Sequence, residues 1–325
     1  MTEAREDTAP DQAGLQAGGS GARPFKKRRR FSVLTRRDRV ILALMVGIPL
    51  ILDFIFIWGP ALVSIALSFT QWRNTQPLTA HDWVGLGNYE KLWSTYPAFW
   101  EGLKHNLLWF LVLLFIATPI GMFFAVLLDR EMRGARIYQT IFYLPVVLSL
   151  AVIGIIWELQ YSQDNGFIDA VLGFFSLPKP DWYGDPNINL WAALVAASWR
   201  HVGYIMVLYL AGLKSVDPSL REAASIDGAN GRQTFLHVVF WVMMPINVVI
   251  VVITTIESLR AFDIVYIINQ GKNGLELLSV LITNNSIGEA NLTGFGSAIA
   301  VVLLVISLVP ILIFLTWSMR GDTQS

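Results

Sequence analysis

Six long apolar stretches restrict the folds that this sequence can adopt. They recur along 325 residues, 54% of which are hydrophobic, and the mean hydropathy is +0.52. An α-helix rises 1.5 Å per residue, so about twenty apolar residues cross the hydrocarbon core of a bilayer. We therefore predict an all-α, polytopic transmembrane helical bundle. The expected spans are residues 40–69, 107–128, 139–160, 189–213, 245–268 and 295–318.

The distribution of Lys and Arg predicts the orientation of these spans. If the N-terminus lies in the cytosol, residues 1–39, 129–138, 214–244 and 319–325 are cytosolic and hold seventeen of the 24 Lys and Arg residues. The outer loops then hold five, which satisfies the positive-inside rule. We expect cytosolic N- and C-termini, a basic and largely disordered tail over 1–39, a membrane domain over 40–318 and a short tail over 319–325. The cluster Lys26–Arg30 is interpreted as a membrane anchor beside lipid, not as a nucleic-acid site.

A polar segment interrupts the apolar pattern between the fourth and fifth spans. Asp217 is placed to cap a helix, Pro218 suits the first helical position, and Gly228 is placed to end the helix. A second short helical run is expected at about Arg232 to Val239. Two short helices joined at a glycine on a cytosolic face predict a compact docking surface for a partner protein.

The residues of this segment resemble the cytoplasmic EAA loop of bacterial ABC importer permeases. Seven positions carry the likeness, which is closest to the maltose and glycerol-phosphate type of sugar importer: Glu222, Ala223, Ala224, Asp227, Gly228, Ala229 and Phe235. Blocks at 84–89, 136–145, 181–186, 258–266 and 294–298 resemble the same family in the same order. The family usually has Leu-Pro where this chain has Phe240-Trp241. We therefore expect the helix leading into the fifth span to be less sharply broken than usual.

The resemblance implies a function and a set of partners. The chain would be a permease subunit in a bacterial inner membrane that translocates a sugar delivered by an extracytoplasmic solute-binding protein. It would pair with a second homologous permease subunit and contact two ATPase subunits through the seven positions. A sugar phosphate such as glycerol phosphate is the alternative cargo. The chain has no G-x-x-x-x-G-K-[ST] motif, so ATP and Mg²⁺ would bind the partner ATPase and this chain would hold no cofactor.

Ionisable side chains within spans are costly and are therefore candidates for the substrate path. Glu257, Arg260 and Asp263 are spaced by three residues, which predicts an ion-paired row on one face of the fifth span. This row either lines a translocation cavity or only holds the bundle together.

A second candidate set lies in the fourth span. Arg200 and His201, with Trp199 and Tyr204 nearby, combine a guanidinium, aromatic faces and a hydroxyl, which suits a polyol. The alternative is a structural salt bridge from Arg200 to an acid such as Glu158.

Other kinds of chemistry find no support in the sequence. The chain has no cysteine and its four histidines are far apart, so no metal site is expected. No nucleophile elbow or glycosidase-like carboxylate pair is present, so the chain is not expected to be an enzyme. A rival class is an ion-coupled secondary transporter that moves a proton through Asp53, Glu257 or Asp263.

Overall fold

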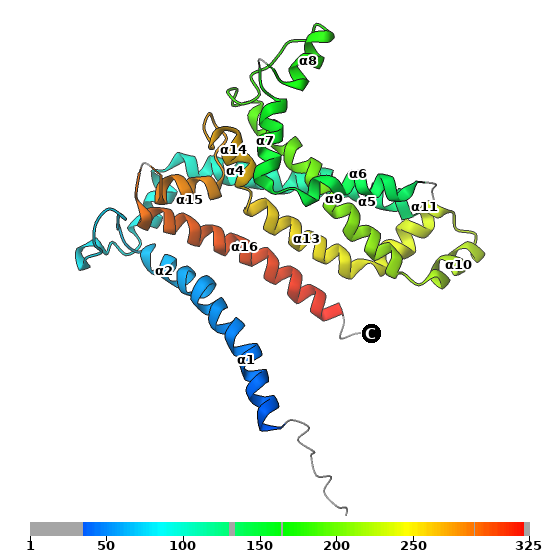
Figure 1. The fold of residues 1–325 in the computed structure, drawn as a ribbon, viewed down its shortest axis with the longest axis horizontal. Coiled ribbons are helices and arrows are strands. Elements are labelled where there is room, and N and C mark those ends of the chain that lie inside the picture. The colour runs from blue at the N-terminus through cyan, green and yellow to red at the C-terminus, as the bar shows by residue number, and fades with distance from the viewer. Residues whose placement is uncertain (1–34, 130–133, 164, 289, 322–325) are drawn as a thin grey trace, which may run out of the picture. The chain divides into compact units, whose positions relative to one another are not determined.

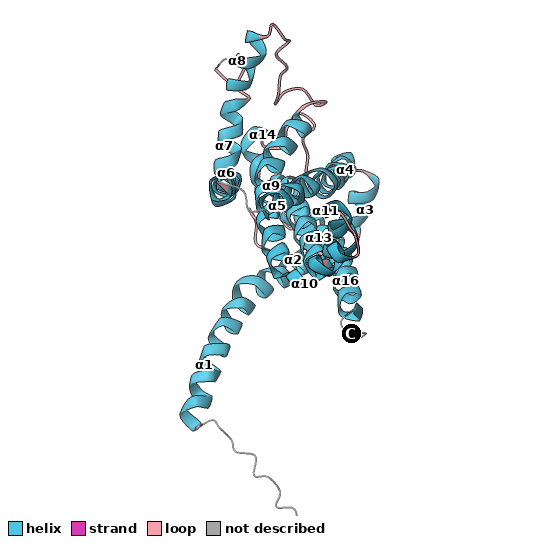
Figure 2. Cartoon of the chain, turned by 90° about the vertical axis from the view of Figure 1, so that its right-hand side faces the viewer, coloured by secondary structure: helices cyan, strands magenta, loops and turns pink. Residues whose placement is uncertain are grey.

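The computed structural model describes residues 35–129, 134–163, 165–288 and 290–321. Most of the predicted N-terminal tail, residues 1–34, and the last four residues of the C-terminal tail lie outside the described residues. The described part of the chain is helical and contains no strand, as the colouring of Figure 2 shows, and the all-α prediction is confirmed.

The chain divides into two units, residues 1–55 and 56–325. The described part of the first unit, residues 35–55, holds the helix α1 (Arg36–Asp53) and the start of a π-helical turn, η1 (Phe54–Trp58), which the unit boundary divides. The helix begins four residues before the predicted span because Thr35 and Asp38 form a capping box. The Asp38 N–H donates to Thr35 Oγ1 at 3.2 Å, and the Thr35 N–H donates to Asp38 Oδ2 at 2.9 Å.

The other helices of the described residues lie in the second unit (Figure 1). In chain order they are α2 (Gly59–Leu67), η2 (Ala80–Asp82), α3 (Gly87–Ser94), α4 (Pro97–Val112), η3 (Leu113–Ala117), α5 (Thr118–Asp129), α6 (Ala135–Val147), α7 (Leu150–Gln160), α8 (Phe167–Phe174), α9 (Asn189–Ser215), α10 (Pro218–Ile226), α11 (Gly231–Thr234), η4 (Phe235–Val239), α12 (Phe240–Val242), α13 (Met244–Leu259), α14 (Asp263–Asn269), α15 (Leu278–Ser286) and α16 (Thr293–Gly321).

Helix α9 packs closely against α5 and α6, and glycines permit the close approach. A Cβ atom at Gly121 of α5 would lie 2.8 Å from the Val202 oxygen of α9. A Cβ at Gly203 of α9 would lie still closer to the Phe142 oxygen of α6. Ile205 and Met206 are fully buried at this contact. The close packing fixes the position of α9, which carries four of the candidate site residues.

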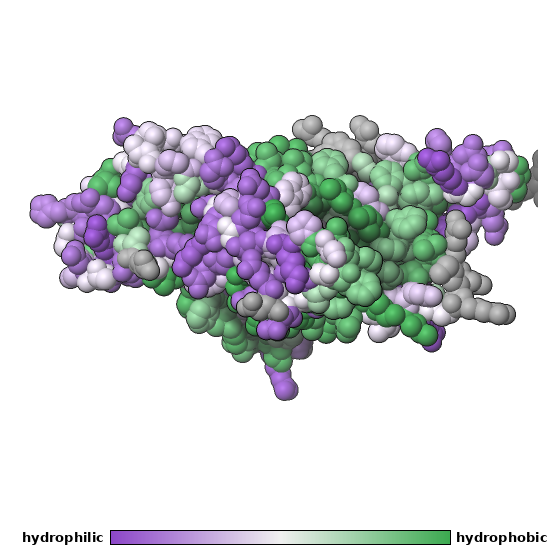
Figure 3. Space-filling model, turned by 90° about the horizontal axis from the view of Figure 1, so that it is seen from above, coloured by the Kyte–Doolittle hydropathy of each residue, from purple (hydrophilic) through white to green (hydrophobic). Residues whose placement is uncertain are grey.

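Among the described residues, four helical stretches are long and apolar enough to cross a membrane: Arg36–Leu67, Pro97–Asp129, Asn189–Ser215 and Thr293–Phe314. Two further pairs of helices are bent, and the number of candidate spans reaches six if each pair counts as one. In Figure 3, apolar side chains (green) form a broad surface to the right of the centre and along the lower edge, and hydrophilic side chains (purple) cover the left, the centre and the upper right.

The predicted third span, 139–160, is not one continuous helix. Helices α6 and α7 meet at an angle of 100°. Leu148 is extended, with ψ 144°, and the Ser149 hydroxyl accepts a hydrogen bond from the Val152 N–H at 3.3 Å. Ser149 therefore caps a new helix where the apolar pattern alone predicts continuation.

Candidate functional site

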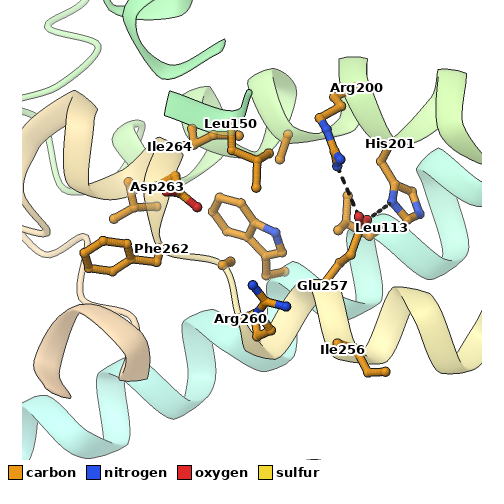
Figure 4. Close-up of a pocket in the computed structure, with 14 residues that line it drawn as sticks. Leu113, Leu150, Arg200, His201, Ile256, Glu257, Arg260, Phe262, Asp263 and Ile264 are labelled. Atoms are coloured by element: carbon orange, nitrogen blue, oxygen red, sulfur yellow. Dashed lines mark hydrogen bonds and ion pairs between the residues drawn. The ribbon is translucent and has the colours of Figure 1, made fainter. Parts of the chain in front are cut away.

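A cavity of about 250 Å³ lies between α9, α13 and the link from α13 to α14. Its lining brings together five of the seven predicted substrate-path residues, and Figure 4 labels all five: Arg200, His201, Glu257, Arg260 and Asp263. Trp109 of α4, Leu150 of α7 and Phe262 add apolar surface. The cavity thus offers both charged groups and apolar faces to a small molecule.

Glu257 of α13 joins the two neighbouring basic residues of α9. Arg200 Nη1 lies 3.1 Å from Glu257 Oε1, and His201 Nδ1 lies 2.9 Å from Oε2 (Figure 4). The expected alternative of an interhelical salt bridge from Arg200 to an acid is therefore present, but the acid is Glu257 of α13 and not Glu158. His201 is 2% exposed, and its Nε2 lies 3.3 Å from Thr118 Oγ1 and 3.4 Å from Thr254 Oγ1. Each polar atom of this imidazole thus has a partner.

The predicted ion-paired row of Glu257, Arg260 and Asp263 does not form, because helix α13 ends at Leu259. Arg260 caps α13, and Asp263 begins α14. Within the described residues, the side chains of Arg260 and Asp263 form no hydrogen bond or ion pair, yet both line the cavity. They remain available to a bound molecule.

Asn106, which the sequence interpretation missed, stabilises the break between α13 and α14. Its side chain is fully buried. Nδ2 donates to the Ser258 oxygen at 3.0 Å, and Oδ1 accepts from the Leu278 N–H at 2.9 Å. The amide therefore pairs a carbonyl at the end of α13 with the first N–H of α15. The only signal in the sequence is a polar residue directly before an apolar run.

Trp199 and Tyr204 do not line the cavity. Trp199 is 40% exposed and lies edge-on to Trp157, with 6.0 Å between the ring centroids. Tyr204 packs against the buried cluster that contains Ile205 and Met206. Tyr204 follows Arg200 by one helical turn, so it lies further along α9, beyond the end of the cavity.

The predicted docking segment consists of two short helices. The Ser219 N–H donates to Asp217 Oδ1 at 2.9 Å at the start of α10, and this hydrogen bond holds the pKa of the Asp217 carboxyl below its usual range. Gly228 follows α10 with φ +83°, a left-handed conformation that favours glycine. Asn230 and Gln233 then form a capping box for α11. The local signals in the sequence predicted this break correctly.

The seven family-like positions of the segment differ in exposure. Glu222, Ala223, Asp227 and Gly228 are exposed, and Ala229 is half-buried. Ala224 is buried at 8% exposure, and Phe235 packs against the buried cluster around Met206. The adjacent Ile226 is 84% exposed. The outer surface of α10 thus carries a carboxylate beside small and apolar groups, while Ala224 and Phe235 attach the segment to the bundle.

The helix that leads from the docking segment into α13 bends sharply. The angle between Gly231–Val242 and Met244–Asn269 is 74°. Pro245 lies in the first turn of α13 and has no N–H to donate. Asn247 Nδ2 also donates to the Phe240 oxygen at 3.0 Å, across the bend. The bend therefore persists with Trp241 in the place of a family proline.

The remaining candidate groups are simpler to place. Asp53 is the last residue of α1, in the first unit. Across the described residues, no group of three or more His, Asp or Glu side chains could hold a metal ion.

Comparisons with known proteins identify the family. The family described as binding-protein-dependent transport system inner membrane component matches residues 117–320. A probable ABC transporter permease protein from Pyrococcus horikoshii is 33% identical over 281 residues, covering 85% of this chain and 94% of the relative. A xylose/arabinose import permease protein from Haloferax volcanii is 30% identical over 269 residues, covering 81% and 83%.

A solved structure shares the fold. It is the bacterial alginate ABC transporter in complex with alginate pentasaccharide-bound periplasmic protein, with a TM-score of 0.76 and 21% identity over 87% of this chain and 95% of the matched chain.

Proteins of this kind are the non-catalytic membrane components of their transporters, and they cross the inner membrane several times. The expectation that this chain is not itself an enzyme is confirmed by that relationship. The chain belongs to the family of inner membrane components of binding-protein-dependent transport systems.

Proposed function

We propose that this chain is one of two homologous permease subunits in an ATP-driven importer for a neutral sugar. In this proposal, an extracytoplasmic binding protein delivers the sugar, and two ATPase subunits bind ATP and Mg²⁺ on the cytosolic side, where both ends of this chain lie. The observation that carries the proposal is the pairing of a charged cavity at α9 and α13 with an exposed two-helix segment that follows α9 directly.

The chemistry of the cavity supports a sugar as the cargo. Trp109 and Phe262 contribute aromatic rings, while the side chains of Arg260 and Asp263 have no partner within the described residues. Sugars present apolar ring faces and dense hydrogen-bonding edges, so such a mixture suits them. The relative from Haloferax volcanii, which is a xylose/arabinose import permease protein, agrees with this cargo class.

The balance of charge favours a neutral sugar over a sugar phosphate. Two guanidinium groups line the cavity, and two carboxylates lie beside them. The Arg200 guanidinium, the expected anion partner, already lies 3.1 Å from the Glu257 carboxylate. A phosphate group would have to displace that carboxylate and would then meet its charge at close range.

The docking segment supports coupling to an ATPase. Glu222 and Ala223 are exposed on α10, and Ala223 has a side chain small enough to allow close approach of a partner. Glu222 would meet a basic group, and Ile226 would enter an apolar hollow. When ATP draws the two ATPase subunits together, α10 moves with them as a rigid element and turns the cavity toward the outer side.

The first experiment is a pull-down of the tagged full chain from its native membranes, followed by mass spectrometry. We expect an ATPase and a second permease to copurify, and Glu222→Arg to remove the ATPase while membrane insertion is unchanged. The matched control is Glu101→Arg, the same charge reversal at an exposed site on α4. Retention of the ATPase by Glu222→Arg would contradict the docking assignment.

The cargo class is tested on the binding protein that copurifies. We expect isothermal titration to detect binding of neutral sugars, with maltose, xylose and arabinose as probes, and no binding of glycerol 3-phosphate. The opposite result would replace the neutral sugar with a sugar phosphate. A chain that purifies alone and accumulates maltose in liposomes on a proton gradient would instead establish the secondary-transporter alternative.

A further inference from the structure

Arg221 lies beside the proposed docking residues of α10 but is directed toward the bundle. Its Nη1 donates to Asp129 Oδ2 at 2.8 Å, and its Nη2 donates to the Leu213 oxygen at 3.1 Å. Asp129 is the last residue of α5, and Leu213 lies in the last turn of α9. One guanidinium therefore joins α10 to the ends of two long helices.

Both acceptors require a donor at this place. A carboxylate at the C-terminal end of a helix is repelled by the partial negative charge of the last carbonyls, and Asp129 is only 15% exposed. The last four carbonyls of α9 have no helical partner. The Ser215 hydroxyl donates to one of them, Gly212, at 2.7 Å, and Arg221 donates to the next, Leu213. The planar fork of Arg meets both demands at once.

The two helices that Arg221 joins also pack closely against each other. Gly121 of α5 meets the backbone of α9 at Val202, next to His201 in the cavity. The Arg221 side chain therefore transmits a displacement of α10 to the closely packed pair α5 and α9, and α9 forms part of the cavity wall. The neighbouring residue, Glu222, is exposed, and its side chain forms no hydrogen bond or ion pair with the bundle within the described residues.

We infer that Arg221 is the positioning residue that locks α10 to α5 and α9, with Asp129 as its partner, so that these three helices move as one body. This inference rests on the proposed function, in which α10 receives the motion of an ATPase. Glu222 and its neighbours then bind the ATPase, whereas Arg221 transmits the displacement.

Spin labels test whether α10 and α5 move together. The chain has no cysteine, so labels attach only where cysteines are introduced. We place them at Phe115→Cys, a 66% exposed residue of η3, which leads directly into α5, and at the exposed Ser225→Cys of α10. Phe115 is fourteen residues from Asp129, about 21 Å along the helix, which suits distance measurement by electron resonance. The sample is the whole importer in nanodiscs, with and without ATP and vanadate.

We expect one narrow distance distribution in both nucleotide states. Asp129→Asn and Arg221→Gln should each increase the width of the distance distribution severalfold when ATP and vanadate are present. The exchanged pair Asp129→Arg with Arg221→Asp should narrow the distribution in part, because it restores the ion pair but not the hydrogen bond to the Leu213 oxygen. A role limited to folding would not produce this narrowing. The matched control, Glu101→Gln, breaks a 2.8 Å ion pair with Lys104 that is exposed and should leave the distribution unchanged.

Two outcomes would overturn the inference. Single variants that keep the narrow distribution would show that Arg221 does not lock α10, and an exchanged pair that stays as broad as the single variants would show that the ion pair is not the lock. Copurification of the ATPase separates this result from a failure of the proposed function. Asp129→Asn should still bind the ATPase, whereas a wild-type chain that binds none would refute the importer assignment itself.

Discussion

Arg200 and Glu257, which are 57 residues apart in the chain, join α9 to α13 through an ion pair of 3.1 Å. His201 occupies the second oxygen of the same carboxylate at 2.9 Å. One acid therefore satisfies two neighbouring bases from another helix. The arrangement makes Glu257 a brace between α9 and α13 as well as part of the cavity wall.

Replacement of Glu257 should destabilise the protein. In Glu257→Gln, the guanidinium of Arg200 loses its charged partner at a site where its side chain is only 20% exposed. Leaving such a group without its partner costs about 1–3 kcal/mol. We expect a lower midpoint of thermal unfolding for the purified complex in detergent, followed by the loss of its monodisperse peak in size-exclusion chromatography.

An exposed ion pair provides the control for this effect. Lys104 and Glu101 lie 2.8 Å apart, but their side chains are 68% and 51% exposed. Such a pair contributes less than about 1 kcal/mol, so Glu101→Gln should unfold at nearly the wild-type temperature. Equal midpoints for Glu257→Gln and the wild type would show that the brace adds no stability.

Asn106 should be sensitive to substitution for a different reason. Its amide pairs two buried backbone groups, the Ser258 oxygen and the Leu278 N–H. Asn106→Ala leaves both without a partner, and we expect a loss of about 2–4 kcal/mol in the free energy of unfolding. Asn187, an exposed residue that bonds only within its own turn, is the control. Hydrogen exchange at Leu278 should rise in Asn106→Ala and stay unchanged in Asn187→Ala.

The N-cap of α10 should weaken in acid. The hydrogen bond from the Ser219 N–H lowers the pKa of Asp217 in the folded state. A lowered carboxyl pKa stabilises the fold above the ordinary value of about 4, and the contribution is lost as the pH falls through the lower folded value. Asp217→Asn keeps a capping side chain without a titrating charge.

This pH effect is measured by hydrogen exchange of the α10 amides, with the two proteins compared at each pH. Wild-type α10 should lose protection relative to Asp217→Asn below about pH 4 and match it at pH 6. If the wild type and Asp217→Asn protect the α10 amides equally at both pH values, the Asp217 charge does not stabilise the cap.

Local patterns made part of this molecule predictable. Asp217, Pro218 and Gly228 mark the ends of α10 through their own backbone preferences, and the structure has the helix between them. Long apolar runs indicated the continuous helices in the same way. These features depend on residues that are close together in the chain, which is why a sequence pattern could reveal them.

The cavity depends on residues that are distant in sequence. The spacing of Glu257 and Arg260 predicts that both lie on one face of a helix. The helix α13 ends at Leu259, however, where the Ser258 carbonyl accepts a hydrogen bond from Asn106, 152 residues away in the chain. Which acid meets Arg200 is decided by the faces on which α9 and α13 pack. Five of the seven candidate residues line the cavity. The sequence pattern did not predict that Glu257 pairs with Arg200 and His201 in place of Arg260.

Arg260 offers the sharpest test of the cavity, because its side chain forms no hydrogen bond or ion pair within the described residues. Arg260→Gln should therefore leave the free energy of unfolding within about 0.5 kcal/mol of the wild type, and the thermal midpoint of the complex nearly unchanged, while it weakens the proposed contact with cargo. A lost hydrogen bond from a charged group costs about 1.5–3 kcal/mol, so uptake of the sugar identified with the binding protein should fall about tenfold or more. Arg200→Gln, the matched variant, should lower both uptake and the midpoint, since its partner Glu257 is left unpaired. Wild-type uptake by Arg260→Gln would move the sugar contact away from the link between α13 and α14.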